Sequence, residues 1–166
     1  MDALNRLKAL MEQPRKVLLT SHRNPDGDAI GSMLGLYHLL RKRGHEVAMA
    51  VPSAFPEFLD WMPGVDQILI HDDQAEACSP VADGAEVVFY LDFNDIERID
   101  KLGELCHATE AFKVMIDHHL EPQEGIVDYM LSVPSASSTC ELVWDFIHLM
   151  GWQDQIDCRV AECLFT

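Results

Sequence analysis

Short apolar runs alternate along this chain with longer stretches in which apolar residues recur every three or four positions. The runs are typical of strands buried on both faces of a parallel sheet, and the periodic stretches are typical of amphipathic helices. We expect strands at 16–20, 47–51, 67–70, 86–91 and 112–116, with a sixth at 126–131. We expect helices at 3–12, 29–43, 96–106, 138–150 and from about 154 onward, a short helix at 55–61, and a polar helix or loop at 72–82.

The alternation of strands and helices predicts an α/β fold, a doubly wound parallel β-sheet of about five or six strands flanked by helices. Pro14 and Gly44 are expected to end the first two helices. Ser138, with Glu141 three residues later, has the spacing of a capping box at a helix start. At 166 residues the chain is long enough for one such domain and too short for two ordinary ones.

Three of the expected strands end in side chains that commonly bind metals. In a parallel sheet the carboxyl ends of all strands lie on one edge, where ligands usually bind. Folding should therefore bring four carboxylates and three imidazoles together at that edge. These residues are His22, Asp26, Asp28, Asp92, Asp117, His118 and His119.

Carboxylates this close repel one another and raise their own pKa values unless divalent cations lie between them. A set of carboxylates and imidazoles without thiolate favours Mn²⁺ over a structural Zn²⁺ site. Each motif also has a purely structural interpretation: Asn24-Pro25-Asp26-Gly27 is a turn sequence, and Asp28 is a helix cap. The coincidence of three such strand ends favours the metal site.

Other polar residues fit this pattern less well. The segment His71-Asp72-Asp73 also follows an apolar run, so periodicity alone does not exclude it. Ser137 and Ser138, at the amino end of a helix, either bind a phosphate or simply cap the helix. The remaining histidines lie on or beside expected helices, away from this edge: His38, His45, His107 and His148.

The acidic net charge disfavours long nucleic acids as partners. Asp and Glu number 28 against 12 Lys and Arg, for a net charge of -16, and such a surface repels long duplex nucleic acid. A short phosphorylated substrate remains compatible if metal ions reverse the local sign. No run is long enough to span a membrane, and the five cysteines form no Cys-x-x-Cys pair. We expect a cytoplasmic protein without a membrane partner, its cysteines being buried free thiols.

Two motifs together resemble those of the DHH phosphoesterases: His-Arg-Asn-Pro-Asp-Gly-Asp-Ala-Ile-Gly-Ser at 22–32, and Asp-His-His at 117–119. The segment Ala-Ser-Ser-Thr-Cys-Glu-Leu-Val at 136–143 is similar to the branch of bifunctional oligoribonucleases (nanoRNases) that also dephosphorylate 3′-phosphoadenosine 5′-phosphate. The resemblance covers nearly the whole chain. It implies a parallel sheet flanked by helices and a site for two Mn²⁺ ions, with Mg²⁺ or Co²⁺ as substitutes.

The resemblance also implies a role for each metal-site residue. His22 and Asp26 would hold one ion, Asp28 and His118 would hold the other, and Asp92 would bridge the two.

The same resemblance implies roles outside the ligand set. His119 would contact the substrate phosphate, and Asp117 would orient the neighbouring imidazoles. Because His71-Asp72-Asp73 matches no motif of the family, the resemblance excludes that segment.

The family carries a fourth motif, typically Thr-Asp-x-Gly, after an apolar segment like 161–166, and a C-terminal substrate-binding domain with a Gly-rich, basic surface. On this basis residues 1–166 are expected to form the N-terminal domain, ending before the fourth metal motif and without the second domain. We assign the activity to the complete protein and expect the isolated chain to bind metal weakly and turn over poorly.

The expected function is that of a phosphoric ester hydrolase. It would act on short oligoribonucleotides as a 3′–5′ exoribonuclease, on 3′-phosphoadenosine 5′-phosphate, or on both. Alternatives of the same superfamily are a cyclic-dinucleotide phosphodiesterase, an inorganic pyrophosphatase and a longer-strand exonuclease, of which the acidic charge disfavours the last. An alternative of another class is a non-catalytic nucleotide-binding module. The sequence does not determine the oligomeric state, and a homodimer is one candidate.

Overall fold

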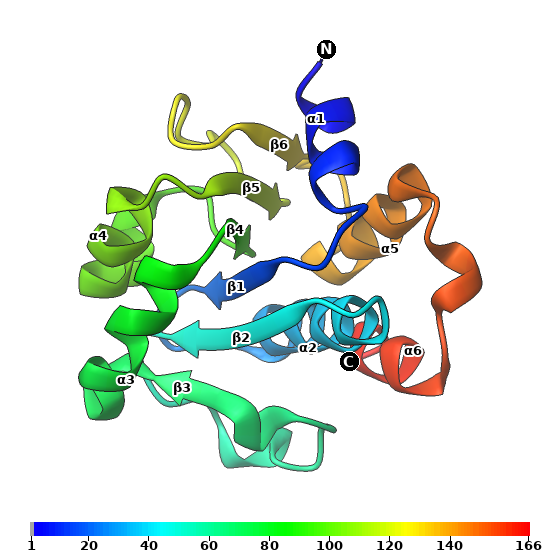
Figure 1. Cartoon of the computed structure of the whole chain (residues 1–166). Coiled ribbons are helices and arrows are strands. Elements are labelled where there is room, and N and C mark those ends of the chain that lie inside the picture. Colours follow the sequence, from blue (N-terminus) through cyan, green and yellow to red (C-terminus); the bar gives the residue numbers. More distant parts are fainter. Residues whose placement is uncertain (1) are drawn as a thin grey trace.

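The computed structural model describes residues 2–166 (Figure 1). Over this range six parallel strands form one sheet: β1 (Lys16–Ser21), β2 (Glu46–Val51), β3 (Ile68–Ile70), β4 (Val87–Leu91), β5 (Phe112–Asp117) and β6 (Tyr129–Ser132). The helices are α1 (Ala3–Leu10), α2 (Gly27–Lys42), α3 (His71–Gly84), α4 (Asp100–Ala108), α5 (Thr139–Met150) and α6 (Cys158–Leu164). Short 3-10 helices lie at Glu57–Leu59, Val65–Gln67, Ile96–Ile99 and Gln153–Gln155. The predicted α/β fold is confirmed.

The strand order is β3-β2-β1-β4-β5-β6. From β1 the chain moves outward through β2 to β3, and then returns across the sheet to β4, on the other side of β1. In a doubly wound sheet such a reversal opens a crevice at the carboxyl ends of the two central strands. The crevice in this fold therefore lies where β1 and β4 end.

Helices cover both faces of the sheet, which explains why its strands are apolar almost throughout. On one face α1, α2 and α5 pack on an apolar layer that includes Val17, Leu19 and Phe89, all of them buried, and α6 packs against α2. On the other face α3 and α4 pack on Leu18 and Tyr90. Neighbouring positions of one strand thus enter two separate apolar layers, as the alternation of side chains along a strand requires.

Two glycines within α2 allow α6 to approach closely. A Cβ atom added to Gly31 would lie 2.6 Å from the carbonyl oxygen of Cys163, and one added to Gly35 would lie 2.5 Å from a methyl carbon of Leu164. Glycine inside a helix costs about 1 kcal/mol relative to alanine. The close packing of α6 on α2 explains why glycine occupies both positions. It holds α6 against α2, the helix that follows the loop carrying His22.

Two helix boundaries differ from the sequence-based prediction. The last helix was expected to begin near residue 154, which is wrong: a 3-10 turn occupies Gln153–Gln155, and α6 begins at Cys158, where Asp157 accepts hydrogen bonds from two backbone N–H groups. The helix expected at 96–106 is divided at Asp100, whose φ is 45°. Both breaks depend on the backbone conformation of a single residue, Asp157 or Asp100, and the spacing of apolar residues does not predict that conformation.

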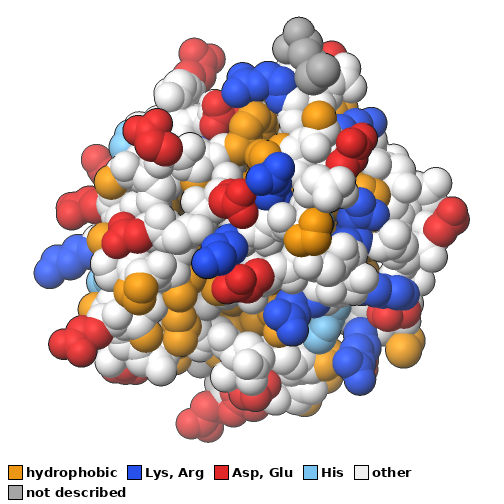
Figure 2. Space-filling model, viewed as in Figure 1, with side chains coloured by type: hydrophobic (Ala, Val, Ile, Leu, Met, Phe, Trp, Pro, Cys, Tyr) orange, Lys and Arg blue, Asp and Glu red, His pale blue; other side chains and the backbone are white. Residues whose placement is uncertain are grey.

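Charged side chains, which the composition gives as mostly acidic, lie on the surface of the molecule. On the face shown in Figure 2, acidic side chains project around the outline and basic side chains lie among them. Among the described residues 2–166, no helix is both long enough and apolar enough to cross a membrane.

Candidate metal centre

The carboxyl ends of β1, β4 and β5 lie side by side because these strands are neighbours in the sheet. Ser21 of β1 pairs with Leu91 of β4, and Leu91 pairs with Ile116 of β5. The residues that follow these partners along the three strands are His22, Asp92 and Asp117-His118-His119. The structure therefore brings three segments, spread over about a hundred positions of the sequence, to one edge of the sheet.

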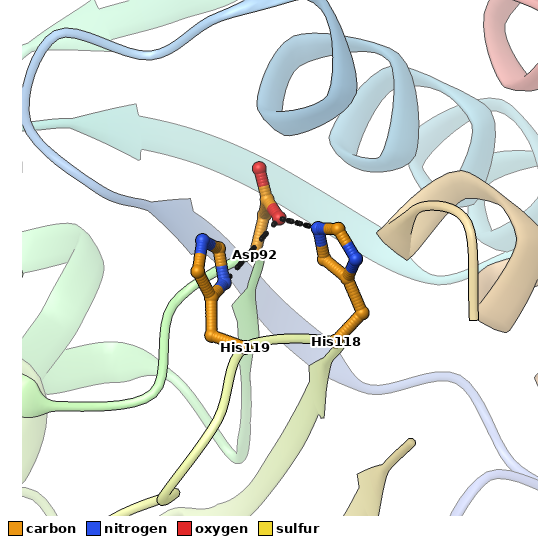
Figure 3. Close-up of side chains that lie close together, drawn as sticks. All are labelled: Asp92, His118 and His119. Atoms are coloured by element: carbon orange, nitrogen blue, oxygen red, sulfur yellow. Dashed lines mark ion pairs between the residues drawn. The ribbon is translucent and has the colours of Figure 1, made fainter. Parts of the chain in front are cut away.

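Asp92 occupies the centre of this edge and is 2% exposed. Its φ of 63° lies in the left-handed region, an uncommon conformation for a residue with a side chain. One carboxylate oxygen, Oδ2, lies 3.4 Å from Nε2 of His22, and the other, Oδ1, lies 3.6 Å from Nε2 of His118. Figure 3 shows the carboxylate between His118 and His119. The two oxygens of one buried carboxylate thus face imidazoles from two different strands.

Two groups of candidate ligands share this carboxylate. Asp92 groups with His22 and Asp26 on one side and with His118 and His119 on the other, and within each group the candidate ligand atoms lie within 4.8 Å of one another. Asp26 is exposed, and its Oδ1 accepts the N–H of Ala29 at 3.0 Å, so it also caps α2. A carboxylate common to two ligand groups fits a pair of neighbouring metal ions.

The ring orientations of His22 and His118 fit a metal centre. Nδ1 of His22 lies 2.8 Å from the carbonyl oxygen of Arg23, and Nδ1 of His118 lies 3.4 Å from that of Ala136. Because a carbonyl oxygen only accepts, each Nδ1 carries a proton and each Nε2 faces a carboxylate. A lone pair of Nε2 against a carboxylate oxygen is repulsive unless a proton or a cation lies between them. The imidazole and carboxylate donors suit Mn²⁺ or a similar ion.

Asp28 lies beside this group, held by the amino end of α5. Its Oδ2 accepts the N–H of Thr139 at 2.7 Å, and its Oδ1 accepts the N–H of Cys140 at 2.8 Å. The same Oδ2 lies 3.5 Å from Nε2 of His118. Asp28 is therefore next to the imidazole with which it was expected to share an ion, and each of its oxygens keeps a second lone pair.

His119 is oriented differently from its neighbour. Its Nδ1 donates to Oδ1 of Asp117 at 2.6 Å, and its backbone N–H donates to Oδ2 of the same carboxylate at 3.0 Å. Asp117 is fully buried. This pair fixes the ring of His119 with Nε2 turned away from Asp117, the geometry that a phosphate contact would require. The phosphate contact itself stays a prediction.

Burial, hydrogen bonds and neighbouring charges together shift the pKa values of Asp92 and His22. Burial raises the pKa of Asp92, and the neighbouring Asp28 carboxylate raises it further, against the opposing effect of the hydrogen bonds from His22 and Thr139. Burial lowers the pKa of His22, but its interactions with Asp92 and with the Arg23 carbonyl outweigh that effect, so its pKa lies above the ordinary value. Protonation thus relieves at this edge the same repulsion that a bound cation would relieve.

Ser137 and Ser138 make the capping contacts that were the alternative to phosphate binding. The N–H and the hydroxyl of Ser137 both donate to Oε2 of Glu141, at 2.7 and 2.6 Å. The hydroxyl oxygen of Ser138 accepts the N–H of Glu141 at 3.1 Å. The expected capping residue is therefore correct, although the glutamate reaches Ser137 in place of Ser138. A substrate contact by either serine stays a prediction.

The segment that the family resemblance excluded lies close to the site without joining it. Asp72, in the first turn of α3, accepts two hydrogen bonds from the guanidinium of Arg23, and neither His71 nor Asp73 belongs to either ligand group. Three of the other histidines form hydrogen bonds away from the site: His38 with the Pro63 carbonyl, His45 with the Arg15 N–H, and His148 with the Trp144 carbonyl.

Sequence reasoning missed Thr139, which donates its hydroxyl to Oδ1 of Asp92 at 2.8 Å and is fully buried. The signals in the sequence were its position next to the capping serine and its place in the 136–143 segment that resembles the family. Nothing in these signals indicates which carboxylate lies opposite.

Comparisons with known proteins agree with this geometry. The bifunctional oligoribonuclease and PAP phosphatase NrnA of Thermus thermophilus is 33% identical over 156 residues, which cover 90% of this chain and 42% of that protein. A probable manganese-dependent inorganic pyrophosphatase of Oceanobacillus iheyensis is 34% identical over 105 residues, which cover 63% of this chain and 31% of that protein. The chain therefore spans less than half the length of these relatives.

A solved structure is similar over nearly all of the chain. The crystal structure of an exopolyphosphatase-related protein from Bacteroides fragilis has a TM-score of 0.95 at 41% identity, covering 99% of this chain and 48% of that one. Residues 16–166 match the DHH family, N-terminal domain. This match contains all three strand ends that meet at Asp92, and it shows that the chain belongs to the DHH family, as an N-terminal domain with a metal site of the DHH type.

Proposed function

We propose that this chain is the metal-binding domain of a phosphoesterase that acts on short oligoribonucleotides, on 3′-phosphoadenosine 5′-phosphate, or on both. The observation that carries the proposal is the position of Asp92, a buried carboxylate whose two oxygens face two separate imidazoles. The similarity to the bifunctional oligoribonuclease and PAP phosphatase NrnA of Thermus thermophilus supports this substrate class.

Five residues would hold two divalent ions, with Mn²⁺ as the favoured metal. His22 and Asp26 would bind on one side, His118 and Asp28 on the other, and Asp92 would bind on both. When bound, the ions supply the positive charge that attracts and polarises a phosphoryl group. Without them the carboxylates at this edge repel a phosphate, so substrate binding and metal binding are expected to be coupled.

His119 would contact the substrate directly, and Asp117 would orient the His119 ring. With Nδ1–H donated to the buried Asp117, Nε2 is the ring nitrogen left for the substrate. His119 would then contact a phosphate oxygen through Nε2, while Asp117 keeps the ring aligned.

The first experiment tests metal-dependent phosphate binding. Calorimetry with inorganic phosphate should show binding to the manganese-loaded chain and none after chelation, since the site charge then reverses sign. Tight phosphate binding in the presence of a chelator would contradict the proposal.

The second experiment distinguishes substrates. With Mn²⁺ present, a diribonucleotide and 3′-phosphoadenosine 5′-phosphate should be hydrolysed faster than pyrophosphate, and the Asp92→Asn variant should hydrolyse none of them. Because the chain spans less than half of its relatives, slow turnover is expected, and a C-terminally extended protein is assayed beside it. Hydrolysis of pyrophosphate alone would favour an inorganic pyrophosphatase like the Oceanobacillus relative, and binding without hydrolysis in either form would favour a nucleotide-binding module.

A further inference from the structure

Thr139, the first residue of α5, contacts two candidate metal ligands that come from different parts of the fold. Its backbone N–H donates to Oδ2 of Asp28 at 2.7 Å, and its hydroxyl donates to Oδ1 of Asp92 at 2.8 Å. Asp28 lies in the first turn of α2, and Asp92 follows β4. A single fully buried residue therefore connects both carboxylates.

The hydroxyl contact determines how the Asp92 carboxylate is rotated. The bond between Cβ and Cγ of an aspartate is a soft torsion with broad preferences, so the carboxylate plane needs an external constraint. Oδ1 is the oxygen nearest to His118, at 3.6 Å, whereas Oδ2 is the one nearest to His22, at 3.4 Å. The hydrogen bond from Thr139 to Oδ1 keeps one oxygen directed at each imidazole.

The backbone contact determines where Asp28 lies relative to that carboxylate. Both oxygens of Asp28 are engaged by the first two N–H groups of α5, those of Thr139 and Cys140. Removing the Thr139 side chain would leave these two bonds in place. The hydroxyl is therefore the part of Thr139 that a substitution can test separately.

We propose that Thr139 is a positioning residue of the metal centre. Its hydroxyl fixes the rotation of the shared Asp92 carboxylate, so that Oδ1 faces His118, beside Asp28, while Oδ2 faces His22. The inference rests on the proposed two-ion function. It assigns to the hydroxyl no contact with substrate. Residues that orient metal ligands in this way typically change metal affinity by about 10-fold to 100-fold when they are removed.

The experiment compares Thr139→Val with Thr139→Ser in the full chain, using Mn²⁺ as the probe. Valine keeps the branched shape and the backbone N–H but lacks the hydroxyl, so its Mn²⁺ affinity, measured by calorimetry, should fall by about 10-fold or more. Serine keeps the hydroxyl and should restore the affinity of the unsubstituted chain. Electron paramagnetic resonance should show the spin-coupled spectrum of two nearby ions in the serine variant and a weakened one in the valine variant.

Thr20→Val is the matched control. Thr20 is also fully buried, lies on the neighbouring strand β1, and has a hydroxyl without a hydrogen-bond partner among residues 2–166. This substitution removes a buried hydroxyl of the same kind, so it should leave the Mn²⁺ affinity unchanged. A fall equal to that of the Thr139 variant would mean that any buried hydroxyl has this effect, and it would overturn the inference.

Two further outcomes are distinguishable. If Thr139→Val binds Mn²⁺ with unchanged affinity and spectrum, the inference is overturned while the proposed function stands. If the unsubstituted chain binds no Mn²⁺, the metal centre is overturned and the inference with it. Urea unfolding of each metal-free variant is measured first. Should the valine variant not fold, Thr139→Ala takes its place, and affinity equal to that of the serine variant would then overturn the inference.

Discussion

The guanidinium of Arg23 donates two hydrogen bonds to the carboxylate of Asp72, at 2.7 and 2.9 Å. A third bond, from Nε, goes to Asp100 at the start of α4. Arg23 is also the residue whose carbonyl oxygen accepts Nδ1–H of His22. The segment that matched no family motif therefore has a structural contact with the loop that presents a candidate metal ligand.

The first prediction concerns this contact. Asp72→Asn removes one of the two carboxylates that hold the arginine, so the loop around His22 should become less ordered and Mn²⁺ affinity should fall, by no more than about 10-fold. The loss in unfolding free energy should be small, because the pair is exposed to solvent. Calorimetry with Mn²⁺ and urea unfolding measure the two quantities.

The matched control for this prediction is Glu86→Gln. Glu86 pairs with Arg15 at 2.8 Å with similar exposure, but beside the amino ends of β1 and β4, at the opposite edge of the sheet. It should show a similar small loss of stability with no change in Mn²⁺ affinity. Equal affinities in the two variants would contradict a role for the Arg23 contact.

Asp92→Asn should abolish metal binding, because it removes the carboxylate common to both ligand groups. The metal-free variant should nevertheless be no less stable than the unsubstituted chain near neutral pH, since a buried carboxylate beside Asp28 is replaced by a neutral amide of equal size. Thermal unfolding with and without Mn²⁺ measures both effects. Asp145→Asn, at an exposed position of α5, is the control and should keep the Mn²⁺-dependent rise in Tm.

The adjacent histidines should give different results. His118→Ala removes an Nε2 that faces both Asp28 and Asp92, so Mn²⁺ affinity should fall by about 100-fold or more. His119→Ala should leave Mn²⁺ affinity within about threefold and weaken inorganic phosphate binding to the loaded chain by about 10-fold. Calorimetry with each ligand separates the two, and an equal loss of metal affinity in both variants would show that His119 is a ligand.

The pH dependence of stability can be tested at Glu86. The backbone N–H of Lys16 and the guanidinium of Arg15 lower the pKa of Glu86 below its ordinary value. A lowered pKa in the folded state means that this stabilisation is present above the ordinary value and is lost as the pH falls through the lower, folded-state value. Glu86→Gln should therefore destabilise the chain near neutral pH and have no effect in strong acid. Urea midpoints at about pH 7 and about pH 2 measure the difference, and equal effects at both would contradict it.

Local patterns in the sequence determined most of the fold. The apolar runs at the core strands, the apolar period of α2 and α5, and the cap at Ser138 are short-range features, so they could be interpreted without coordinates. The break before α6 could not be predicted in this way, because Asp157 adopts an extended conformation within a helix-like pattern.

The residue types at the strand ends, His22, Asp92 and Asp117-His118-His119, were also evident in the sequence, and the parallel sheet explained why they meet. Only the tertiary structure decided which oxygen of Asp92 faces which ring, that Asp28 is held by α5, and that Thr139 connects the two. These relationships depend on hydrogen bonds of a few ångströms between residues far apart in the chain. Such distances are set by packing of whole elements, and no local pattern of hydrophobic and polar residues carries that information.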